Sequence, residues 1–330
     1  MIVGVTLDDI DAFLEETRSY VDAEISDSLS AVSNMEIFPV VSYALGNGGK
    51  RLRPIISILA AQAMGNAREH VMKLAVAFEM LHTATIVHDD IIDGDETRRE
   101  VQSVNRRWGR DTAILAGDAL ISLGIRLSSG YGSRVIGSVA DYGMDLCNGE
   151  YIDISEERNV SIDHYLRKIY LKSASLFKAA AECAAIASSA GEEEVGRLSR
   201  FGESFGMAYQ IKDDILDTSV NGGGAGCDLM SGKITLPVVH LYNNADDSEK
   251  ERVRDIFRRI RLEKDMADRA DLAKKISEMI NTSGSIGYCN KTLSEYVDKG
   301  IRELLALPDN VYRNYLIDMT RKIKSGEISP

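Results

Sequence analysis

Apolar residues recur every three or four positions along most of the chain, with polar residues between them. Residues at this spacing share one face of an α-helix, so the pattern is typical of amphipathic or buried helices. It predicts helices at residues 7–29, 40–45, 55–64, 71–92, 111–128, 131–150, 162–190, 193–218, 233–244, 248–262, 267–281, 286–305 and 308–324. No segment alternates apolar and polar residues as a series of strands would, so we expect an all-α fold.

The connections between these predicted helices are short, and none is a linker rich in proline and serine. Short connections are expected within one compact helical domain. We therefore expect residues 1–330 to form a single large helical bundle. Two glycine-rich breaks, at 46–49 and 221–226, give the backbone unusual freedom, and both lie beside charged motifs.

The composition supports a large helical core. The 330 residues are 44% hydrophobic and include only 5 prolines and 6% aromatic residues. Alanine, leucine, glutamate, lysine and arginine, which lose little side-chain freedom in helices, fill the long uninterrupted stretches. Disorder is therefore excluded as a description of the chain.

The net charge of −12 argues against nucleic acid as a partner, because such proteins need basic surfaces to displace counterions. The four cysteines, Cys147, Cys183, Cys227 and Cys289, are far apart and form no CxxC pair. Their spacing indicates neither a zinc site nor a disulfide framework, and it fits a reducing, cytoplasmic location.

Neither the N-terminal segment nor the most apolar stretch of the chain is typical of a membrane protein. The N-terminal sequence MIVGVTLDDIDAF lacks a basic segment followed by an apolar one, so we expect no signal peptide. The most apolar stretch, at 112–127, is interrupted by Asp118 and Arg126 and is too short to cross a bilayer. We therefore expect no transmembrane segment.

An aspartate cluster ends one predicted apolar helix. Asp89 and Asp93 are four residues apart and therefore share a helical face, with Asp90 beside them. Carboxylates this close repel one another unless a cation lies between them, and oxygen ligands suit a hard ion such as Mg²⁺. Alone, such a cluster is more often a solvated helix end.

A calcium-binding EF-hand is an alternative for the same segment. Asp89, Asp93, Gly94 and Glu100 occupy the first, fifth, sixth and twelfth positions of that loop. Ile91, however, stands where an oxygen ligand is needed, and no second copy is present. The EF-hand is therefore disfavoured.

A second cluster repeats the first. Asp213, Asp214 and Asp217 end another apolar helix with the same spacing. Two copies by chance are improbable, and two such clusters facing a cavity could hold several Mg²⁺ ions that clamp a diphosphate.

Basic residues accompany the glycine turn and both clusters. Arginine and lysine bind phosphate oxygens, and arginine does so with a planar fork. These residues are Lys50, Arg51, Arg53, Arg98, Arg99, Lys172 and Lys233. Each stands near glycine or aspartate in the sequence, which suits two anionic substrates.

With these motifs in order, nearly the whole chain resembles the trans-isoprenyl diphosphate synthases of the polyprenyl synthetase family. The resemblance is carried by GGKRLRP at 48–54, HTATIVHDDIIDGDETRR at 82–99, LAGDAL at 115–120, GEYIDI at 149–154, KSASLF at 172–177, FGMAYQIKDDILD at 205–217 and DLMSGKITLP at 228–237. It implies an all-helical, usually homodimeric enzyme with a central cavity.

The resemblance also implies roles for individual residues. The Mg²⁺ ligands, direct or through water, would be Asp89, Asp90, Asp93, Asp213, Asp214 and Asp217. The allylic diphosphate would be held by Arg98, Lys172, Gln210 and Lys233, with Ser173 where the family often has threonine. Isopentenyl diphosphate would be bound by Lys50, Arg53, His82 and Arg99.

Two positions depart from the family pattern. The loop at 221–227 has no lysine, although family members commonly carry one there, so one diphosphate contact is in doubt. Asp153 stands where many long-chain members have glutamine, as in relatives that make shorter products.

The family reaction needs no protein nucleophile. The resemblance implies that the allylic diphosphate leaves, the alkene of isopentenyl diphosphate attacks the carbocation, and a proton is lost. Accordingly, no Ser-His-Asp or Cys-His constellation is evident. His88 lies beside the first cluster, but packing between helices explains it better than a catalytic base.

Two rival functions share the resemblance. A terpene cyclase needs no second diphosphate site, and Lys50, Arg53 and Arg99 argue against it. A non-catalytic partner subunit would be expected to lose metal ligands, and both aspartate clusters are intact.

The helix before the first cluster is expected to form one wall of the product cavity. At about 1.5 Å per residue, Ala84 lies roughly 7 Å below Asp89, Leu81 roughly 12 Å and Phe78 roughly 16 Å. Ala84 and Thr85 are small, whereas an aromatic residue near there commonly closes the pocket in the family. We therefore expect a product of geranylgeranyl length or longer, unless Ala84 is small only for helix packing.

Overall fold

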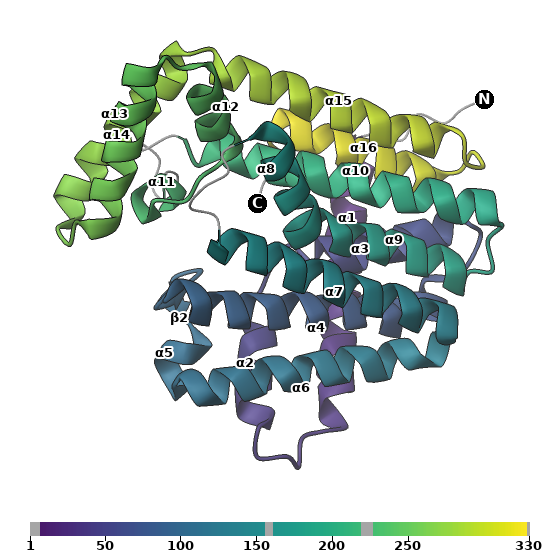
Figure 1. The fold of residues 1–330 in the computed structure, drawn as a ribbon. Coiled ribbons are helices and arrows are strands. Elements are labelled where there is room, and N and C mark those ends of the chain that lie inside the picture. The colour runs from purple at the N-terminus through teal and green to yellow at the C-terminus, as the bar shows by residue number, and fades with distance from the viewer. Residues whose placement is uncertain (1–6, 156–160, 219–226, 329–330) are drawn as a thin grey trace. The chain divides into compact units, whose positions relative to one another are not determined.

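The computed structural model describes residues 7–155, 161–218 and 227–328, and these residues are almost entirely helical (Figure 1). The helices of the first half are α1 (Leu7–Ser30), α2 (Phe38–Gly46), α3 (Leu52–Ala63), α4 (Arg68–Asp93), α5 (Val104–Trp108), α6 (Arg110–Ser128), the short 3₁₀ turn η1 (Ser129–Tyr131) and α7 (Ser133–Ser155). The second half contains α8 (Ile162–Ile169), η2 (Tyr170–Ala174), α9 (Ser175–Ala187), α10 (Glu192–Leu216), α11 (Cys227–Ser231), α12 (Leu236–Asn244), α13 (Asp247–Leu262), α14 (Met266–Thr282), α15 (Ser285–Leu305) and α16 (Val311–Ser325). The all-α prediction is confirmed.

β-Structure among the described residues is limited to one antiparallel pair, β1 (Thr97–Arg98) and β2 (Val101–Gln102). The pair follows α4 directly, and the left-handed residues Arg99 and Glu100 form its turn. It positions Arg98 and Arg99 just after the first aspartate cluster.

The residue contacts divide the chain into two compact units, each assembled from separate parts of the sequence. The first contains Met1–Gly143, Leu176–Gly202 and Glu303–Asp318, and the second contains Met144–Ser175, Glu203–Arg302 and Met319–Pro330. The expectation of one domain over residues 1–330 remains a prediction.

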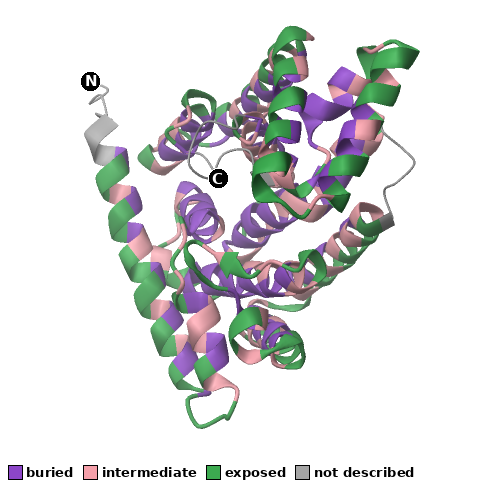
Figure 2. Cartoon of the chain, turned by 90° about the vertical axis from the view of Figure 1, so that its left-hand side faces the viewer, coloured by how far each residue is buried: buried purple, intermediate pink, exposed green. Residues whose placement is uncertain are grey.

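The first unit has an apolar core built around α3 and α4. Phe78, Phe177 and Phe201 are fully buried, and Ile55 and Leu74 are buried with them. Burying each such side chain contributes about 1.5–3 kcal/mol. Along α1, buried residues alternate with exposed ones at helical spacing, as Figure 2 shows for the long helix nearest the N-terminus.

Glycine lets α6 pack directly on α4. A Cβ on Gly117 would lie 2.1 Å from Nε2 of His88, and a Cβ on Gly124 would lie 2.9 Å from Cγ of Leu81. His88 and Leu81 therefore fill the space that the two glycines leave. His88 also lies 3.3 Å from the Ile114 carbonyl oxygen, as its expected packing role requires.

Together, α6 and η1 form a helix that is longer than the apolar stretch at 112–127. By length and composition alone, Arg110–Tyr131 could cross a membrane, with a mean hydropathy of 1.2, and 33% of the window is buried. The expectation that this segment is too short is therefore wrong. A core helix of a water-soluble protein passes the same test, and the absence of a membrane span remains a prediction.

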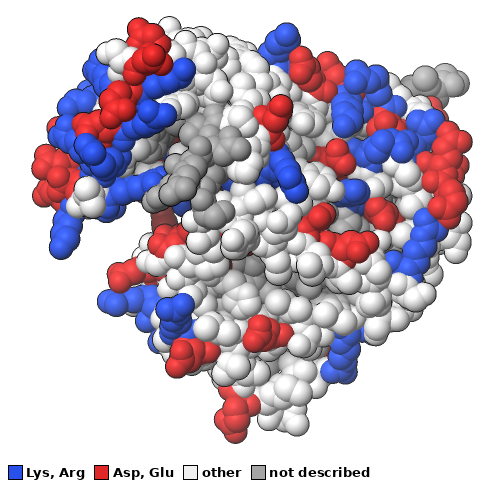
Figure 3. Space-filling model, viewed as in Figure 1, with Lys and Arg blue, Asp and Glu red and all other residues white. Residues whose placement is uncertain are grey.

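In the second unit, α11 to α14 enclose a separate small core. Leu229, Phe257, Ile260 and Ile276 are among its buried residues. The outer faces of α13 and α14 carry mixed acidic and basic side chains, visible at the upper left of Figure 3. These helices are amphipathic, as their period-3.6 pattern predicts.

The helix expected at 162–190 contains a π-helical segment. α8 ends at Ile169, η2 is a π-turn, and α9 begins at Ser175. A π-turn bonds residues five apart and is common at functional sites. A π-turn contains one more residue than an α-helical turn, and apolar spacing does not reveal it. The turn contains Lys172 and Ser173, which the resemblance places at the allylic diphosphate.

Candidate active site

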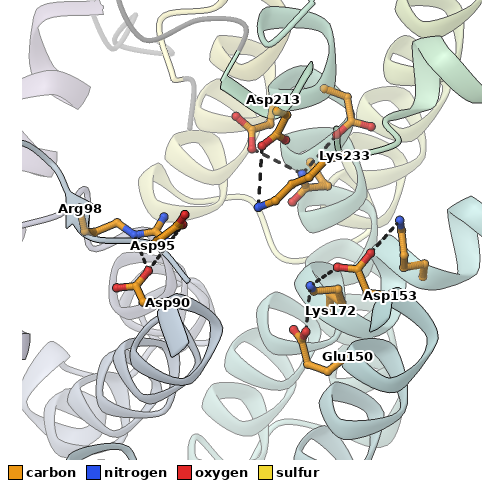
Figure 4. Close-up of polar contacts among 12 residues, drawn as sticks. Asp90, Asp95, Arg98, Glu150, Asp153, Lys172, Asp213 and Lys233 are labelled. Carbon is orange, nitrogen blue, oxygen red and sulfur yellow. Dashed lines mark hydrogen bonds and ion pairs between the residues drawn. The ribbon is translucent and has the colours of Figure 1, made fainter. Parts of the chain in front are cut away.

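The first aspartate cluster forms the last turn of α4. Asp89 and Asp93 lie one turn apart, and Gly94 ends the helix in a left-handed conformation with φ 73°. Asp90 points elsewhere: it is 3% exposed and accepts hydrogen bonds from Arg98 Nε at 3.1 Å and Nη2 at 2.5 Å (Figure 4). The protein therefore uses the middle aspartate to hold Arg98.

The EF-hand alternative is wrong for this segment. An EF-hand needs its first ligands on a loop that follows a helix. Asp89 and Asp93 both lie within α4, and the loop begins only at Gly94.

Arg99 is hydrogen-bonded to the glycine turn that precedes α3. Gly48 and Gly49 have φ values of 72° and 142°, which favour glycine. The Arg99 guanidinium donates hydrogen bonds to the carbonyls of Asn47 and Gly48. A Cβ on Gly49 would lie 2.9 Å from Arg99 Nη1, so the turn needs glycine for this contact.

The three basic residues after the turn have different surroundings. Lys50 is exposed, and the guanidinium of Arg53 lies over the Phe177 ring at 4.2 Å. Arg51 is 5% exposed and makes ion pairs with Glu79 at 2.7 Å and Asp22 at 2.9 Å. Arg51 therefore anchors the turn, while Lys50 and Arg53 remain the candidates for phosphate binding.

His82 lies among these arginines. Burial, together with the positive charges of Arg53 and Arg99, lowers the pKa of His82 well below its usual value. The imidazole is therefore neutral near pH 7 and can donate one hydrogen bond without adding charge. Its ring lines a pocket whose wall consists of Ala44, Asn47, Gly48, Glu79, His82, Thr83, Ile86, Val87, Asp90, Arg98, Arg99, Ser103 and Val104.

The second aspartate cluster has the same internal arrangement. Asp214 is 2% exposed and accepts hydrogen bonds from the Tyr165 hydroxyl at 2.5 Å and the Leu236 backbone N–H at 3.0 Å. Asp213 and Asp217 are one helical turn apart, and the Asp217 N–H donates to the Asp213 carbonyl at 2.9 Å. The middle aspartate is again bound by the protein.

Negative charge is concentrated at this cluster. Burial and the charges of Asp217 and Asp214 raise the pKa of Asp213 to about 8. Burial and the charge of Asp228 raise the pKa of Asp217 as well. Buried carboxylates that repel one another in this way would be stabilised by a divalent cation between them.

The donor set fits Mg²⁺ bound together with phosphate. No three His, Cys, Asp or Glu side chains among residues 7–155, 161–218 and 227–328 form a metal site by themselves. Mg²⁺ is usually held by one or two carboxylates, water and substrate phosphate oxygens, rather than by a complete protein cage. Asp89 with Asp93, and Asp213 with Asp217, are suitable carboxylate pairs.

Lys172 lies against two carboxylates on α7. Its Nζ is 2.6 Å from Asp153 Oδ2 and 2.9 Å from Glu150 Oε2 (Figure 4). The neighbouring Ser173 hydroxyl donates to Gln210 Oε1 at 2.8 Å, and Gln210 Nε2 lies 3.4 Å from Asp213 Oδ2. Ser173 and Gln210, two of the predicted allylic contacts, are thus hydrogen-bonded to the second cluster, whereas Lys172 is held by Glu150 and Asp153.

Lys233 follows the short helix α11. It is exposed, and its Nζ lies 3.9 Å from Asp228 Oδ1. The residues Asn221 to Gly226, where a family lysine is missing, lie outside the described residues.

The residues expected to control product length are all on α4. Phe78, Leu81 and Ala84 are buried, and Thr85 is partly buried. At 100° per residue, Phe78 and Thr85 share the face of Asp89, whereas Leu81 and Ala84 share the face of His88. Since Leu81 contacts α6 at Gly124, the second pair lies on the side that meets α6.

Sequence reasoning missed four charged or polar residues around these sites. They are Glu79, which pairs with Arg51, and Glu150, Tyr165 and Lys168 in the second unit. Lys168 precedes Lys172 by four residues, a spacing visible in the sequence. Their partners come from other segments of the chain, and no spacing rule indicates those contacts.

The chain is similar in sequence and in fold to known proteins. The family model described as polyprenyl synthetase matches residues 35–276. An all-trans-nonaprenyl-diphosphate synthase (geranyl-diphosphate specific) from Rhodobacter capsulatus is 33% identical over 324 residues, covering 95% of this chain and 96% of that protein. A geranylgeranyl diphosphate synthase from Methanosarcina mazei is 31% identical over 326 residues, covering 95% and 97%. The crystal structure of geranylgeranyl pyrophosphate synthetase from Pyrococcus horikoshii has a TM-score of 0.87 at 29% identity, with 96% and 98% covered.

Proposed function

The chain belongs to the polyprenyl synthetase family and is a prenyltransferase, and we propose that it condenses isopentenyl diphosphate with an allylic diphosphate in a Mg²⁺-dependent reaction. The observation that carries the proposal is shared by both clusters. In each, the protein binds the middle aspartate, while the first and last aspartates lie one helical turn apart. Such a pair suits a cation shared with a diphosphate.

The aspartates of the two clusters would have different roles in this reaction. Bound Mg²⁺ would neutralise the charge that develops on the departing diphosphate. Asp89, Asp93, Asp213 and Asp217 would hold it, whereas Asp90 and Asp214 orient Arg98 and Tyr165. The metal role of Asp90 and Asp214, expected from the family, would be indirect, through water or through these partners.

The basic groups separate into two sets. Arg98, Lys172, Ser173, Gln210 and Lys233 would bind the diphosphate that leaves. Lys50, Arg53, His82 and Arg99 would bind the diphosphate that is retained. A neutral His82 suits the second set because it donates a hydrogen bond without strengthening the repulsion among the arginines.

An assay with purified protein separates this function from its rivals. Labelled isopentenyl diphosphate, geranyl diphosphate and Mg²⁺ should give a longer prenyl diphosphate. A cyclic hydrocarbon from an allylic substrate alone would indicate a terpene cyclase. A protein that converts no substrate would instead be a non-catalytic subunit, although the relatives are named as synthases.

The assignment of the retained diphosphate leads to a kinetic prediction. Lys50→Ala and Arg53→Ala should each raise the KM for isopentenyl diphosphate by about tenfold, because each removes one charge-assisted hydrogen bond to that substrate. The KM for the allylic substrate should change less. Steady-state kinetics with each substrate varied in turn measures both values.

Lys73→Ala is a matched control, because Lys73 is an exposed lysine on α4. A larger rise in the allylic KM would reverse the assignment of the two sets. Thermal unfolding of Arg53→Ala should be measured alongside, since its guanidinium also packs on Phe177.

We further propose a product of geranylgeranyl length or longer, limited by α4. Ala84→Phe should shorten the main product, and Phe78→Ala should lengthen it. The reason is that a bulky side chain five residues before Asp89 would narrow the cavity expected beside α4, whereas removing the Phe78 ring would deepen it. Chromatography of the dephosphorylated products measures the length.

Thr85→Phe distinguishes the two faces of α4. If it alone shortens the product, the growing chain follows the face of Asp89. If Ala84→Phe lowers the melting temperature without changing the product, Ala84 is small because α6 packs there.

A homodimer in the cytoplasm is the expected setting. α6 leaves Ile114 38%, Leu115 60% and Ile125 44% exposed, and apolar side chains on one helix are suited to contact with a second copy. Sedimentation equilibrium would measure the assembly, and a monomer at micromolar concentration would contradict it.

A further inference from the structure

A buried lysine in the second unit has no role in the reaction described above. Lys168 on α8 is 6% exposed, and buried lysines are rare unless paired. Its Nζ lies 3.0 Å from Asp153 Oδ1. Lys168 is therefore held by the same carboxylate that holds Lys172.

Asp153 uses both of its oxygens. Oδ1 contacts Lys168 and Oδ2 contacts Lys172 Nζ at 2.6 Å, so the carboxylate bridges two ammonium groups (Figure 4). Although burial opposes ionisation, the two ammonium groups lower the pKa of Asp153 below its usual value. Asp153 is thus a carboxylate near pH 7, with its position set from both sides.

The contacts continue from Lys168 to the second aspartate cluster. Lys168 Nζ lies 4.8 Å from the centre of the Tyr165 ring, within the range of a cation–π interaction. The Tyr165 hydroxyl donates to Asp214 at 2.5 Å. A continuous series of contacts therefore runs from Lys172 through Asp153, Lys168 and Tyr165 to Asp214.

We propose that Asp153 and Lys168 are positioning residues, which fix the Lys172 ammonium relative to the second aspartate cluster so that it meets the allylic diphosphate. The proposal rests on the function proposed above. A lysine side chain loses rotamer entropy when it is ordered. Holding it in place before the substrate binds removes that cost from the binding step.

Charge explains why a second lysine is present. Glu150 and Asp153 carry two negative charges, and Lys168 and Lys172 carry two positive charges, so the group is neutral. Without Lys168 the group would have a net charge of −1, which would repel a diphosphate. Lys168 thus allows Asp153 to orient Lys172 without leaving excess negative charge at the site.

The first test separates positioning from a merely structural ion pair. Asp153→Asn should lower kcat by about tenfold or more, because the charge-assisted contact to Lys172 is lost. It should also lower the melting temperature, since Lys168 is left buried without its carboxylate. The double variant Asp153→Asn with Lys168→Met should regain the melting temperature but not kcat.

Several readouts accompany these variants. Lys168→Met should raise the Kd of geranyl thiolodiphosphate, which calorimetry measures. The carbon–sulfur bond of this analogue does not ionise readily. The KM for isopentenyl diphosphate should stay within about twofold of wild type, since that substrate is assigned to other residues. Asp153→Glu should recover part of kcat, and Arg167→Met, an exposed cation on the same helix, is the control.

Recovery of both stability and kcat in the double variant would overturn the proposal and leave the pair a structural one. Activity of the wild-type enzyme tests the proposed function separately, so the two failures are distinguishable.

A double-mutant cycle tests the link through Tyr165. Tyr165→Phe keeps the ring over Lys168 and removes only the hydrogen bond to Asp214. If the series of contacts acts as a unit, the loss of kcat in Asp153→Asn with Tyr165→Phe should be smaller than the product of the single losses. Losses that multiply would remove Tyr165 and Asp214 from the positioning series.

Discussion

Replacing Asp89 or Asp213 with alanine is expected to lower kcat by at least about 100-fold, the scale of losing a principal electrostatic stabiliser in an active site. Each residue would supply a carboxylate that holds Mg²⁺ against the diphosphate. The half-saturating Mg²⁺ concentration should rise in both variants. Initial rates measured across a Mg²⁺ series, with both substrates saturating, give these values.

The structure provides controls for this loss. Asp141→Ala removes an exposed aspartate on α7 and should leave the rate unchanged. Asp214→Asn should instead lower thermal stability, because Asp214 accepts buried hydrogen bonds from Tyr165 and Leu236. Near-normal turnover of Asp89→Ala or Asp213→Ala at millimolar Mg²⁺ would contradict the two-cluster model.

Helical periodicity predicted most of the fold because apolar faces at period 3.6 determine which residues can be buried. α4, α6 and α13 lie within a few residues of their predicted positions. At 162–190 the backbone is helical as predicted up to Ala187, but the pattern did not show the π-helical segment Tyr170–Ala174, because its extra residue leaves the apolar pattern unchanged. It also gave no sign of α5 or of the two-residue strands, which are too short for a period to appear.

The aspartate spacing predicted two similar clusters, but it could not assign their members. Asp90 and Asp214 look equivalent to their neighbours in the sequence. Their positions 100° around the helix turn them toward Arg98 and Tyr165, and that difference depends on elements elsewhere in the chain.

The basic turn shows the same limit. Lys50, Arg51 and Arg53 follow the glycines as three similar cations, and the sequence does not say which is buried. The structure separates them through Glu79 on α4, which lies 28 residues beyond Arg51. Long-range partners of this kind require the fold.

Arg51→Ala is expected to destabilise the protein by about 3–5 kcal/mol, the usual cost of removing one partner from a buried ion pair. The side chains of Arg51 and Glu79 are 5% and 6% exposed, so the substitution leaves Glu79 as an unpaired buried charge. It also removes a donor from the Leu45 carbonyl, which Arg51 Nη2 contacts at 2.9 Å. The pair with Asp22 adds less, because Asp22 is 54% exposed.

Denaturant unfolding measures the free energy of unfolding of Arg51→Ala, and Lys50→Ala is the control at a neighbouring position. Lys50 is exposed, and its loss should change stability by no more than about 0.5 kcal/mol. The double variant Arg51→Met with Glu79→Leu should recover much of the stability, because replacing both charges with apolar side chains removes the uncompensated carboxylate. Equal stability of Arg51→Ala and Lys50→Ala would show that the buried pair does not anchor the turn. Loss of stability in Arg51→Ala, with the isopentenyl diphosphate KM raised only in Lys50→Ala, would separate the cation that supports the turn from the cation that binds substrate.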